Sequence, residues 1–334
     1  MGGGGGRGGA IHCAATLDLT RCRIAGNSAA GPSDSGRGGA LFVEVGAATL
    51  VDCELSGNTA DSTAAGIGGI GGAIEVWPGY GNATLRRCTV AGNAASAGGG
   101  SATSGGTGGG IHSPAGNNVT LDHTIVAANS AADPAGAPDL AGSATSSGRN
   151  LLGDSAGATL VGGSNDLQDV DPLFADPLNG DWSLQSASPA ADSGDPAFAS
   201  TGGDLAGFSR VLDADLDRKP RVDRGAHEFC HVHLSVSGSA TPGGTITLTS
   251  DGTAGLHGLM IGGIAPAATW LKPFGTLGID LGQLNVIVGW LDVPSVVDVD
   301  LDPALPVPLT FYAQELAYLG RVGNLSNVVR IDVE

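Results

Sequence analysis

Gly38-Gly39-Ala40-Leu41, followed by Leu50-Val51-Asp52-Cys53-Glu54-Leu55-Ser56-Gly57-Asn58, is the stretch that decides the fold. The same pair of motifs recurs in three further segments, which begin at Gly8, Gly71 and Gly108. Self-similarity of this kind is the signature of a fold built from stacked repeat units. The repeats occupy residues 8–140.

Each unit contains two short stretches in which apolar and polar residues alternate. Leu41 and Val43 share one parity in the first stretch, and Cys53 and Leu55 share one in the second. Such alternation places the apolar set inside and the polar set outside. One unit cannot bury its apolar face alone, so copies must stack at about 4.8 Å per rung. We therefore predict an all-β chain with a right-handed parallel β-helix over residues 1–229.

Stacking places equivalent residues in columns. One column holds thiols on the apolar parity, and we interpret it as core filling rather than as a metal or redox site; its members are Cys22, Cys53 and Cys88. A second column holds turn amides, which can bond backbone groups and the amide of the next rung; its members are Asn27, Asn58, Asn93 and Asn129.

An outward column runs beside loops of variable length and holds His12, Phe42, Glu75 and His112. Insertions at one rung position stack on one side of a solenoid, often its binding side. Phe42, Glu75 and His112 are therefore candidate binding residues. Glu75 and His112 would lie on adjacent rungs, close enough to share a proton or a cation, which makes them candidate catalytic residues. The alternative is a solvated face of variable sequence.

The charge balance bounds the function. The formal net charge is −18, and Lys219 and Lys272 are the only lysines. A nucleic-acid partner requires a basic stripe, which the sequence lacks. No apolar run is long enough to span a bilayer. The N-terminus has no apolar segment typical of a signal peptide and leads straight into the repeat, so we expect an export signal and earlier rungs upstream.

A string of motifs follows the repeats, rich in Asp-Pro and Ser-Pro pairs that favour turns. It strongly resembles the choice-of-anchor Q family of bacterial surface proteins, which have a pectin-lyase-like β-helix. The resemblance implies that residues 141–229 are the terminal coils, and that the protein is exported to the cell surface or the extracellular space; it implies no reaction. The motifs are Gly148-Arg149-Asn150-Leu151-Leu152-Gly153, Asp169-Val170-Asp171-Pro172-Leu173-Phe174, Gly180-Asp181-Trp182-Ser183-Leu184, Ser188-Pro189-Ala190-Ala191-Asp192-Ser193-Gly194, Asp204-Leu205-Ala206-Gly207 and Arg221-Val222-Asp223-Arg224-Gly225-Ala226-His227-Glu228-Phe229.

Within this region, Asp213, Asp215 and Asp217 alternate as in the start of a calcium-binding loop. Calcium prefers several carboxylate and carbonyl oxygens. The loop departs from the usual pattern, because Arg218 stands where glycine is expected and Arg224 where glutamate is expected. Two interpretations stay open, a Ca²⁺ site and a solvated turn; no other cofactor is expected.

Residues 230–334 have a different texture, with several strand-like runs separated by Pro/Gly turns, as at Thr241-Pro242-Gly243-Gly244. This spacing predicts a small β-sandwich. Its last part, with Phe311-Tyr312-Ala313-Gln314 and Leu325-Ser326-Asn327-Val328-Val329, resembles a C-terminal module of exported planctomycete-type proteins. The resemblance brings no catalytic residue.

The β-helix fold hosts polysaccharide lyases, glycoside hydrolases, adhesins and structural proteins, so the fold alone does not select a function. Glycoside cleavage needs two carboxylates, and Glu75 is the only one in the outward column. We expect a monomeric, exported bacterial surface or extracellular protein with a structural, adhesive or glycan-binding role. Its expected partners are a polysaccharide or components of the cell envelope or matrix. The alternative is an extracellular polysaccharide lyase or glycoside hydrolase.

Overall fold

The structure is a computed structural model that describes residues 6–31, 35–62, 68–98, 105–114, 118–133, 136–197, 202–217, 219–252, 256–264, 266–271, 275–279, 284–319 and 322–334. Two compact units divide the chain. The first comprises Met1–Gly194 and Asp223–His227, and the second comprises Asp195–Val222 and Glu228–Glu334. The predicted boundary between residues 229 and 230 stays a prediction.

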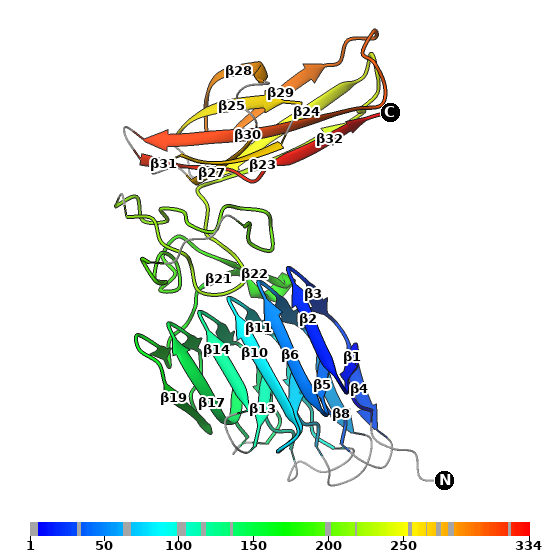
Figure 1. The fold of residues 1–334 in the computed structure, drawn as a ribbon, viewed down its shortest axis with the longest axis vertical. Coiled ribbons are helices and arrows are strands. Elements are labelled where there is room, and N and C mark those ends of the chain that lie inside the picture. Colours follow the sequence, from blue (N-terminus) through cyan, green and yellow to red (C-terminus); the bar gives the residue numbers. More distant parts are fainter. Residues whose placement is uncertain are drawn as a thin grey trace. The chain divides into compact units, whose positions relative to one another are not determined.

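The first unit is a stack of parallel strands, which confirms the predicted parallel β-helix (Figure 1). Four columns of strands repeat from rung to rung. The first column holds β1 (Ile11–Cys13), β5 (Leu41–Val43), β9 (Ile74–Val76) and β13 (Ile111–Ser113), and the second holds β2 (Thr16–Thr20), β6 (Gly46–Val51), β10 (Gly81–Arg86) and β14 (Val119–Asp122). The third column holds β3 (Arg23–Ala25), β7 (Glu54–Ser56), β11 (Thr89–Ala91), β15 (Ile125–Ala127), β18 (Leu151–Leu152) and β20 (Leu167–Gln168). The fourth column holds β4 (Ser28–Gly31), β8 (Thr59–Ser62), β12 (Ala94–Ala95) and β16 (Ser130–Ala131). The long strand β17 (Leu140–Gly148) pairs with both β13 and β14, which joins the first two columns into one sheet, and β19 (Ala158–Gly162) pairs with β17.

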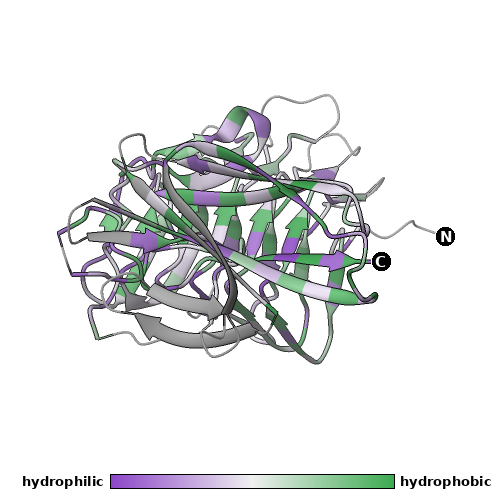
Figure 2. Cartoon of the chain, turned by 90° about the horizontal axis from the view of Figure 1, so that it is seen from above, coloured by the Kyte–Doolittle hydropathy of each residue, from purple (hydrophilic) through white to green (hydrophobic). Residues whose placement is uncertain are grey.

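The register follows the sequence repeat. Leu41 pairs with Ile11 on one side and Ile74 on the other, and Leu55 lies between Ile24 and Val90 in the same way. Like residues therefore stack on like residues, and one apolar cluster runs through the inside of the unit. Hydrophobic and hydrophilic residues alternate along the strands in Figure 2, as expected for strands with one buried face.

The thiol column lies in this interior. Cys53 and Cys88 are buried, and Cys22 is half-buried at the first rung. The backbone N–H of Cys22 donates to Sγ of Cys53 at 3.4 Å, and Thr124 takes the same place in the fourth rung, where its Oγ1 accepts from the N–H of Cys88 at 3.3 Å. Burial raises the pKa of the Cys88 thiol well above its ordinary value. These thiols fill the core as small apolar groups.

The asparagine column forms a continuous ladder of hydrogen bonds at the turn after the third strand column. Each amide Nδ2 donates to Oδ1 of the next rung, at 3.0 Å from Asn27 to Asn58 and at 2.9 Å from Asn58 to Asn93 and from Asn93 to Asn129. Each backbone N–H donates to the same Oδ1. The ladder ends on Asp139, whose Oδ1 accepts from Nδ2 of Asn129 at 2.9 Å. An acceptor at this position satisfies the last donors of the ladder.

The motifs at the end of the repeats form a clasp on the third strand column. β21 (Phe174–Asp176) and β22 (Asp181–Leu184) pair as a hairpin, with Phe174 and Trp182 in edge-to-face contact. Residues 223–227 then run across the stack: Arg224 donates to the carbonyl of Asn150 at 2.6 Å, and the N–H of Gly225 donates to the carbonyl of His123 at 2.7 Å. The conspicuous motifs of this region thus have structural contacts.

The second unit contains antiparallel sheets after residue 230. One sheet has the order β23 (Val232–Gly238), β24 (Thr245–Gly252) and β29 (Ser295–Asp300); another joins β28 (Leu284–Asp292), β25 (His257–Gly263), β30 (Leu309–Leu319) and β31 (Val322–Leu325), with β32 (Val329–Val333) also on β30; β26 (Pro266–Leu271) and β27 (Gly275–Ile279) form a pair. Leu234, Ile246 and Ile331 share one apolar cluster, so the first two sheets pack together. In the described part of the chain, no helix is long and apolar enough to cross a membrane.

Candidate functional site

The outward column is in register on the first strand column. His12 pairs with Phe42, Phe42 with Glu75, and Glu75 with His112. Phe42 and Glu75 are nonetheless 0% exposed, although neither belongs to the apolar cluster inside the helix. At Phe42 and Glu75 the column is therefore not a solvated face, whereas His12 is exposed. The column is a second, small layer on the outside of the sheet.

Side chains from neighbouring positions cover this layer. The rings of Trp77 and Phe42 pack edge-to-face, with centroids 5.8 Å apart. The Arg7 guanidinium lies 5.5 Å from the centroid of Phe42, and that of Arg37 lies 5.1 Å from the centroid of Trp77. Such cation–π contacts are favourable, and more so when they are shielded from water. Aromatic rings and guanidinium groups thus stack along the outer face.

Two carboxylates in this layer have the same kind of environment. Glu44 binds Arg7 through Oε1 at 3.1 Å and His12 through Oε2 at 2.7 Å. Glu75 binds Arg37 through Oε1 at 3.2 Å and His112 through Oε2. Each of the two arginines comes directly before a Gly-Gly pair of the repeat. A parallel β-bridge between their backbones aligns Arg7 with Arg37 on adjacent rungs. We call these two clusters the Glu44 triad (Arg7, His12, Glu44) and the Glu75 triad (Arg37, Glu75, His112).

The two triads differ in access to solvent. The side chains of the Glu44 triad are between 33% and 41% exposed. In the Glu75 triad, the carboxylate is 1% exposed, and Arg37 and His112 are 20% and 16% exposed. The Glu44 triad can therefore contact a ligand directly, whereas Glu75 is enclosed by its partners.

An aromatic turn lies beside the Glu44 triad. Trp77-Pro78-Gly79-Tyr80 connects β9 to β10, and the N–H groups of Tyr80 and Gly81 both donate to the carbonyl of Trp77. Tyr80 is 66% exposed, and Val45 is 47% exposed in the turn one rung earlier. The N–H of Gly46 donates to the carbonyl of Tyr80 at 3.1 Å, which fixes the two turns side by side. Exposed apolar side chains thus flank a polar, charge-balanced cluster.

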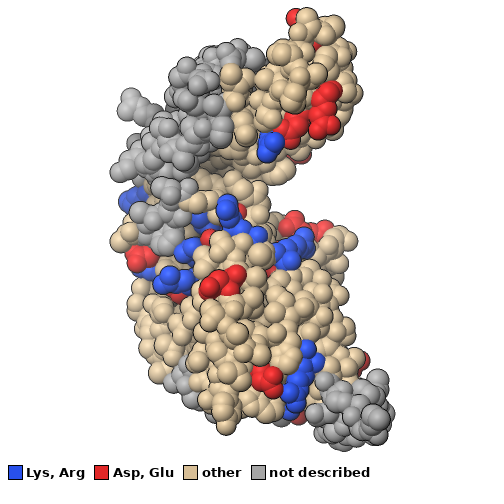
Figure 3. Space-filling model, turned by 45° about the vertical axis from the view of Figure 1, so that its right-hand side comes forward, with Lys and Arg blue, Asp and Glu red and all other residues tan. Residues whose placement is uncertain are grey.

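Charges are sparse on the visible face of the β-helix, and basic atoms lie next to acidic ones (Figure 3). The Glu44 triad offers donors from Arg7, an acceptor from Glu44 and either role from His12. Such a set can bind hydroxyl groups through several hydrogen bonds at once. An exposed aromatic ring beside it can pack against an apolar ligand surface.

Sequence reasoning found the column but not the residues that cover it: Arg7, Arg37, Glu44 and Trp77. Aligning the residue before each Gly-Gly pair would have shown the two arginines. Glu44 and Trp77 lie two positions after Phe42 and Glu75, on the same outward parity. The loop insertions predicted to flank the column lie largely outside the described residues, at 32–34, 63–67 and 99–104.

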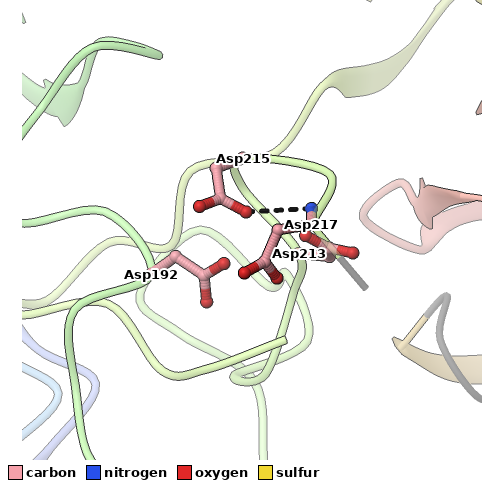
Figure 4. A group of neighbouring side chains, drawn as sticks. All are labelled: Asp192, Asp213, Asp215 and Asp217. Carbon is pink, nitrogen blue, oxygen red and sulfur yellow. Dashed lines mark hydrogen bonds between the residues drawn. The ribbon is translucent and has the colours of Figure 1, made fainter. Parts of the chain in front are cut away.

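The aspartates of the calcium-like loop are brought together (Figure 4). One carboxylate oxygen from each of Asp213, Asp215 and Asp217 lies within 4.8 Å of the others. Asp213 is buried, and Asp215 accepts a hydrogen bond from the N–H of Asp217 at 3.0 Å. Nζ of Lys219 lies 3.3 Å from Asp217 and supplies a positive charge at the loop. Arg218 lies outside the described residues. A Ca²⁺ site here stays a prediction.

Comparison with protein-family models, with curated proteins and with solved structures finds no match to this chain.

Proposed function

We propose that this protein is an exported bacterial cell-surface or extracellular protein that binds glycans through the outer face of its β-helix. We also propose that it belongs to the choice-of-anchor Q group, as its motif string at residues 148–229 suggests. The fold is compatible with such membership, because the motifs between residues 148 and 194 and the segment 223–227 lie in the coils and clasp that follow the repeats. The last antiparallel unit is compatible with a display or anchoring module.

The observation that carries the proposal is the exposed Glu44 triad, which is followed by the exposed Val45 in a turn that is hydrogen-bonded to the turn of the exposed Tyr80. Sugars present an apolar face of C–H groups and a rim of hydroxyls. An exposed aromatic ring suits the first, and the Arg7, His12 and Glu44 side chains suit the second. With two arginines and two glutamates, the formal charges of the outer layer cancel when its histidines are neutral, which favours an uncharged glycan.

Burial of Glu75 supports binding rather than catalysis. A general acid must reach the glycosidic oxygen, and glycoside cleavage needs a second carboxylate at a set separation. Glu75 is enclosed by Arg37 and His112, so it is better suited to hold the layer in place. A polysaccharide lyase or glycoside hydrolase remains the second candidate function because Glu44 and His12 form an exposed pair of possible acid–base groups.

The test is a sedimentation assay of the purified chain with insoluble neutral and acidic polysaccharides. We expect retention on at least one neutral polysaccharide, and loss of retention in Tyr80→Ala and in Glu44→Gln. Val45→Ala should weaken retention, while Val161→Ala, an equally exposed valine on β19, should not. If Tyr80→Ala, Glu44→Gln and Val45→Ala were retained as strongly as the unsubstituted chain, the outer face would not be the binding surface.

The same incubations distinguish the enzymatic alternative. Soluble products are assayed for new reducing ends and for unsaturated sugars. Release of either product, abolished by Glu44→Gln or by a folded Glu75→Gln variant, would replace the binding proposal with a carbohydrate-active enzyme.

A further inference from the structure

A pocket of about 390 Å³ lies on the third strand column, away from the outer layer described above. Its floor is formed by the turns that follow β3, β7 and β11. Its wall is formed by Trp182 of β22 and by the short 3-10 helix η1 (Pro177–Asn179) of the clasp. The pocket is open to solvent on one side. Its size is in the range of small-ligand sites.

The floor is a column of glycines, Gly26, Gly57 and Gly92, one in each rung. At Gly92 the reason is steric, because a Cβ there would collide with the Trp182 ring. Among the described residues, a Cβ at Gly57 would have its nearest contact at 3.9 Å, and one at Gly26 would meet nothing within 4 Å. The space that the Trp182 ring fills over Gly92 continues as the pocket over the next two rungs.

The backbone of this column does not by itself demand glycine. The equivalent residue in the fourth rung is Ala128, which has a φ of 58°, close to the 62° of Gly57. Although glycine adopts this conformation at lower cost, alanine is accommodated there. A flat floor at Gly57 therefore leaves room for a ring, in the way that Gly92 leaves room for Trp182.

One wall of the pocket is apolar and the other polar. Leu178 is 97% exposed at the rim, which is unusual for a large apolar side chain. Nη2 of Arg23 donates to the carbonyl of Gly180 at 3.0 Å, which fixes the guanidinium at the edge of the pocket. Ser56 also lines the pocket, but its side chain is buried and its hydroxyl donates to Glu54.

The charge of Arg23 is compensated from behind the pocket. Glu54 lies 2.8 Å from Nε of Arg23 and 2.8 Å from Nε2 of His227, and it accepts from the Ser56 hydroxyl at 2.6 Å. Burial acts to raise the pKa of Glu54, but the hydrogen bonds of His227 and Ser56 and the charge of Arg23 lower it below its ordinary value. The carboxylate therefore stays ionised and neutralises the guanidinium, so the polar wall does not favour an anionic ligand.

We propose that this pocket binds one uncharged pyranose ring, laid flat on Gly57 and Gly26 against Trp182 and Leu178. The apolar ring face packs on the glycine floor and the apolar wall, and the equatorial hydroxyls meet the guanidinium of Arg23. This pocket is separate from the outer layer, and the proposal holds whether or not the outer layer binds a glycan.

Saturation-transfer difference NMR on the full chain tests this site with methyl β-glucopyranoside, methyl β-galactopyranoside and methyl N-acetyl-β-glucosaminide, each added alone. We expect transfer to the ring C–H protons of at least one glycoside, with a dissociation constant on the order of 1 mM. Methyl β-glucuronide, the charged comparator, should bind more weakly. No transfer from any uncharged glycoside, or tighter binding of the glucuronide, would overturn the proposal.

Variants locate the binding. Gly57→Leu fills the floor and should abolish transfer, and Leu178→Ser should weaken binding severalfold. Leu178 is so exposed that we expect the Leu178→Ser variant to fold. Leu178→Ser therefore tests the proposal if Gly57→Leu does not fold. Val161→Ala, on β19 and outside both proposed sites, should leave the affinity unchanged. Undiminished binding by Leu178→Ser, or a loss of binding in Val161→Ala, would contradict the assignment.

Discussion

At the scale of single residues, the asparagine ladder shows how a repeat couples one side chain to the next. From Asn58 onward, each Oδ1 accepts two hydrogen bonds from the preceding member of the ladder, and the last acceptor is the carboxylate of Asp139. The ladder therefore has one direction: each amide donates to the next member, and Asp139 accepts at the end. Because Asn58, Asn93 and Asn129 are buried, the loss of one partner leaves donors unsatisfied in the interior.

We predict that Asn93→Ala lowers the free energy of unfolding by about 2–4 kcal/mol. Asn93 donates to Asn129 and to the carbonyl of Leu55 and accepts from Asn58, and all of these bonds are buried. Asn27→Ala at the first rung is the matched control and should cost about 1 kcal/mol or less, since that site is partly exposed. Urea unfolding measures both; equal losses at the two positions would contradict the ladder.

The buried carboxyl group of Asp139 leads to a second prediction, on the pH dependence of stability. Burial raises the pKa of this carboxyl above its ordinary value, to about 6. The native state then binds more protons than the unfolded state between about pH 4 and pH 6. The contribution of this group to stability is therefore full at acidic pH and falls as the pH rises through that window, by about 2–3 kcal/mol.

Asp139→Asn removes this titration. In the unsubstituted chain, Oδ2 of Asp139 accepts a hydrogen bond from the N–H of Asp154 at 2.7 Å, and the substitution places an amide near that N–H. Across pH 4–7, the stability of the variant relative to the unsubstituted chain should rise with pH by about 2–3 kcal/mol. Chemical unfolding at several pH values measures the difference. Parallel pH profiles for the two proteins would show that Asp139 does not titrate in this way.

At the scale of elements, the first strand column carries two layers, an apolar interior and an outer layer of aromatic and charged groups. The outer layer contains one exposed and one enclosed Arg–Glu–His triad. Exposed ion pairs contribute little because water screens them, whereas breaking an enclosed pair leaves an uncompensated charge. The same chemistry thus serves access to ligands in one rung and rigidity in the next.

The two triads give a matched comparison. Glu75→Gln should destabilise the β-helix by about 3–5 kcal/mol, because Arg37 keeps its charge in a largely enclosed site. Glu44→Gln should cost less than about 1 kcal/mol. Thermal and urea unfolding of the two variants, side by side, check the prediction. A Glu75→Gln variant as stable as Glu44→Gln would mean that the outer layer does not enclose the carboxylate in solution.

At the scale of the whole molecule, the β-helix is completed by residues distant in sequence. Residues 223–227 belong to the first unit although residues 195–222 belong to the second. The N–H of Ala226 reaches Oγ1 of Thr89 across 137 positions, and His227 reaches Glu54 across 173. The chain therefore leaves the first unit and returns to clasp it.

We predict that a fragment of residues 1–229 retains the stability of the β-helix and that a fragment of residues 1–194 does not. The shorter fragment loses the hydrogen bonds of Arg224, Gly225, Ala226 and His227, together worth on the order of 3–5 kcal/mol. Circular dichroism melts of the two fragments measure the difference. Coincident melting curves would show that residues 223–227 add nothing to the stability of the stack.

The sequence by itself determined the stack, its register and its interior, because equivalent side chains at equivalent rung positions can bury themselves only by piling on one another. It also placed His12, Phe42, Glu75 and His112 in one column, since outward parity follows from the same alternation. Tertiary structure decided which side chains of that column are buried and which are exposed. Phe42 and Glu75 are enclosed because Arg7, Arg37 and Trp77 contact residues of neighbouring rungs, and rung-by-rung alignment does not show how a side chain extends along the stack. The clasp and the pocket over Gly57 likewise depend on closure between distant segments, which local periodicity does not encode.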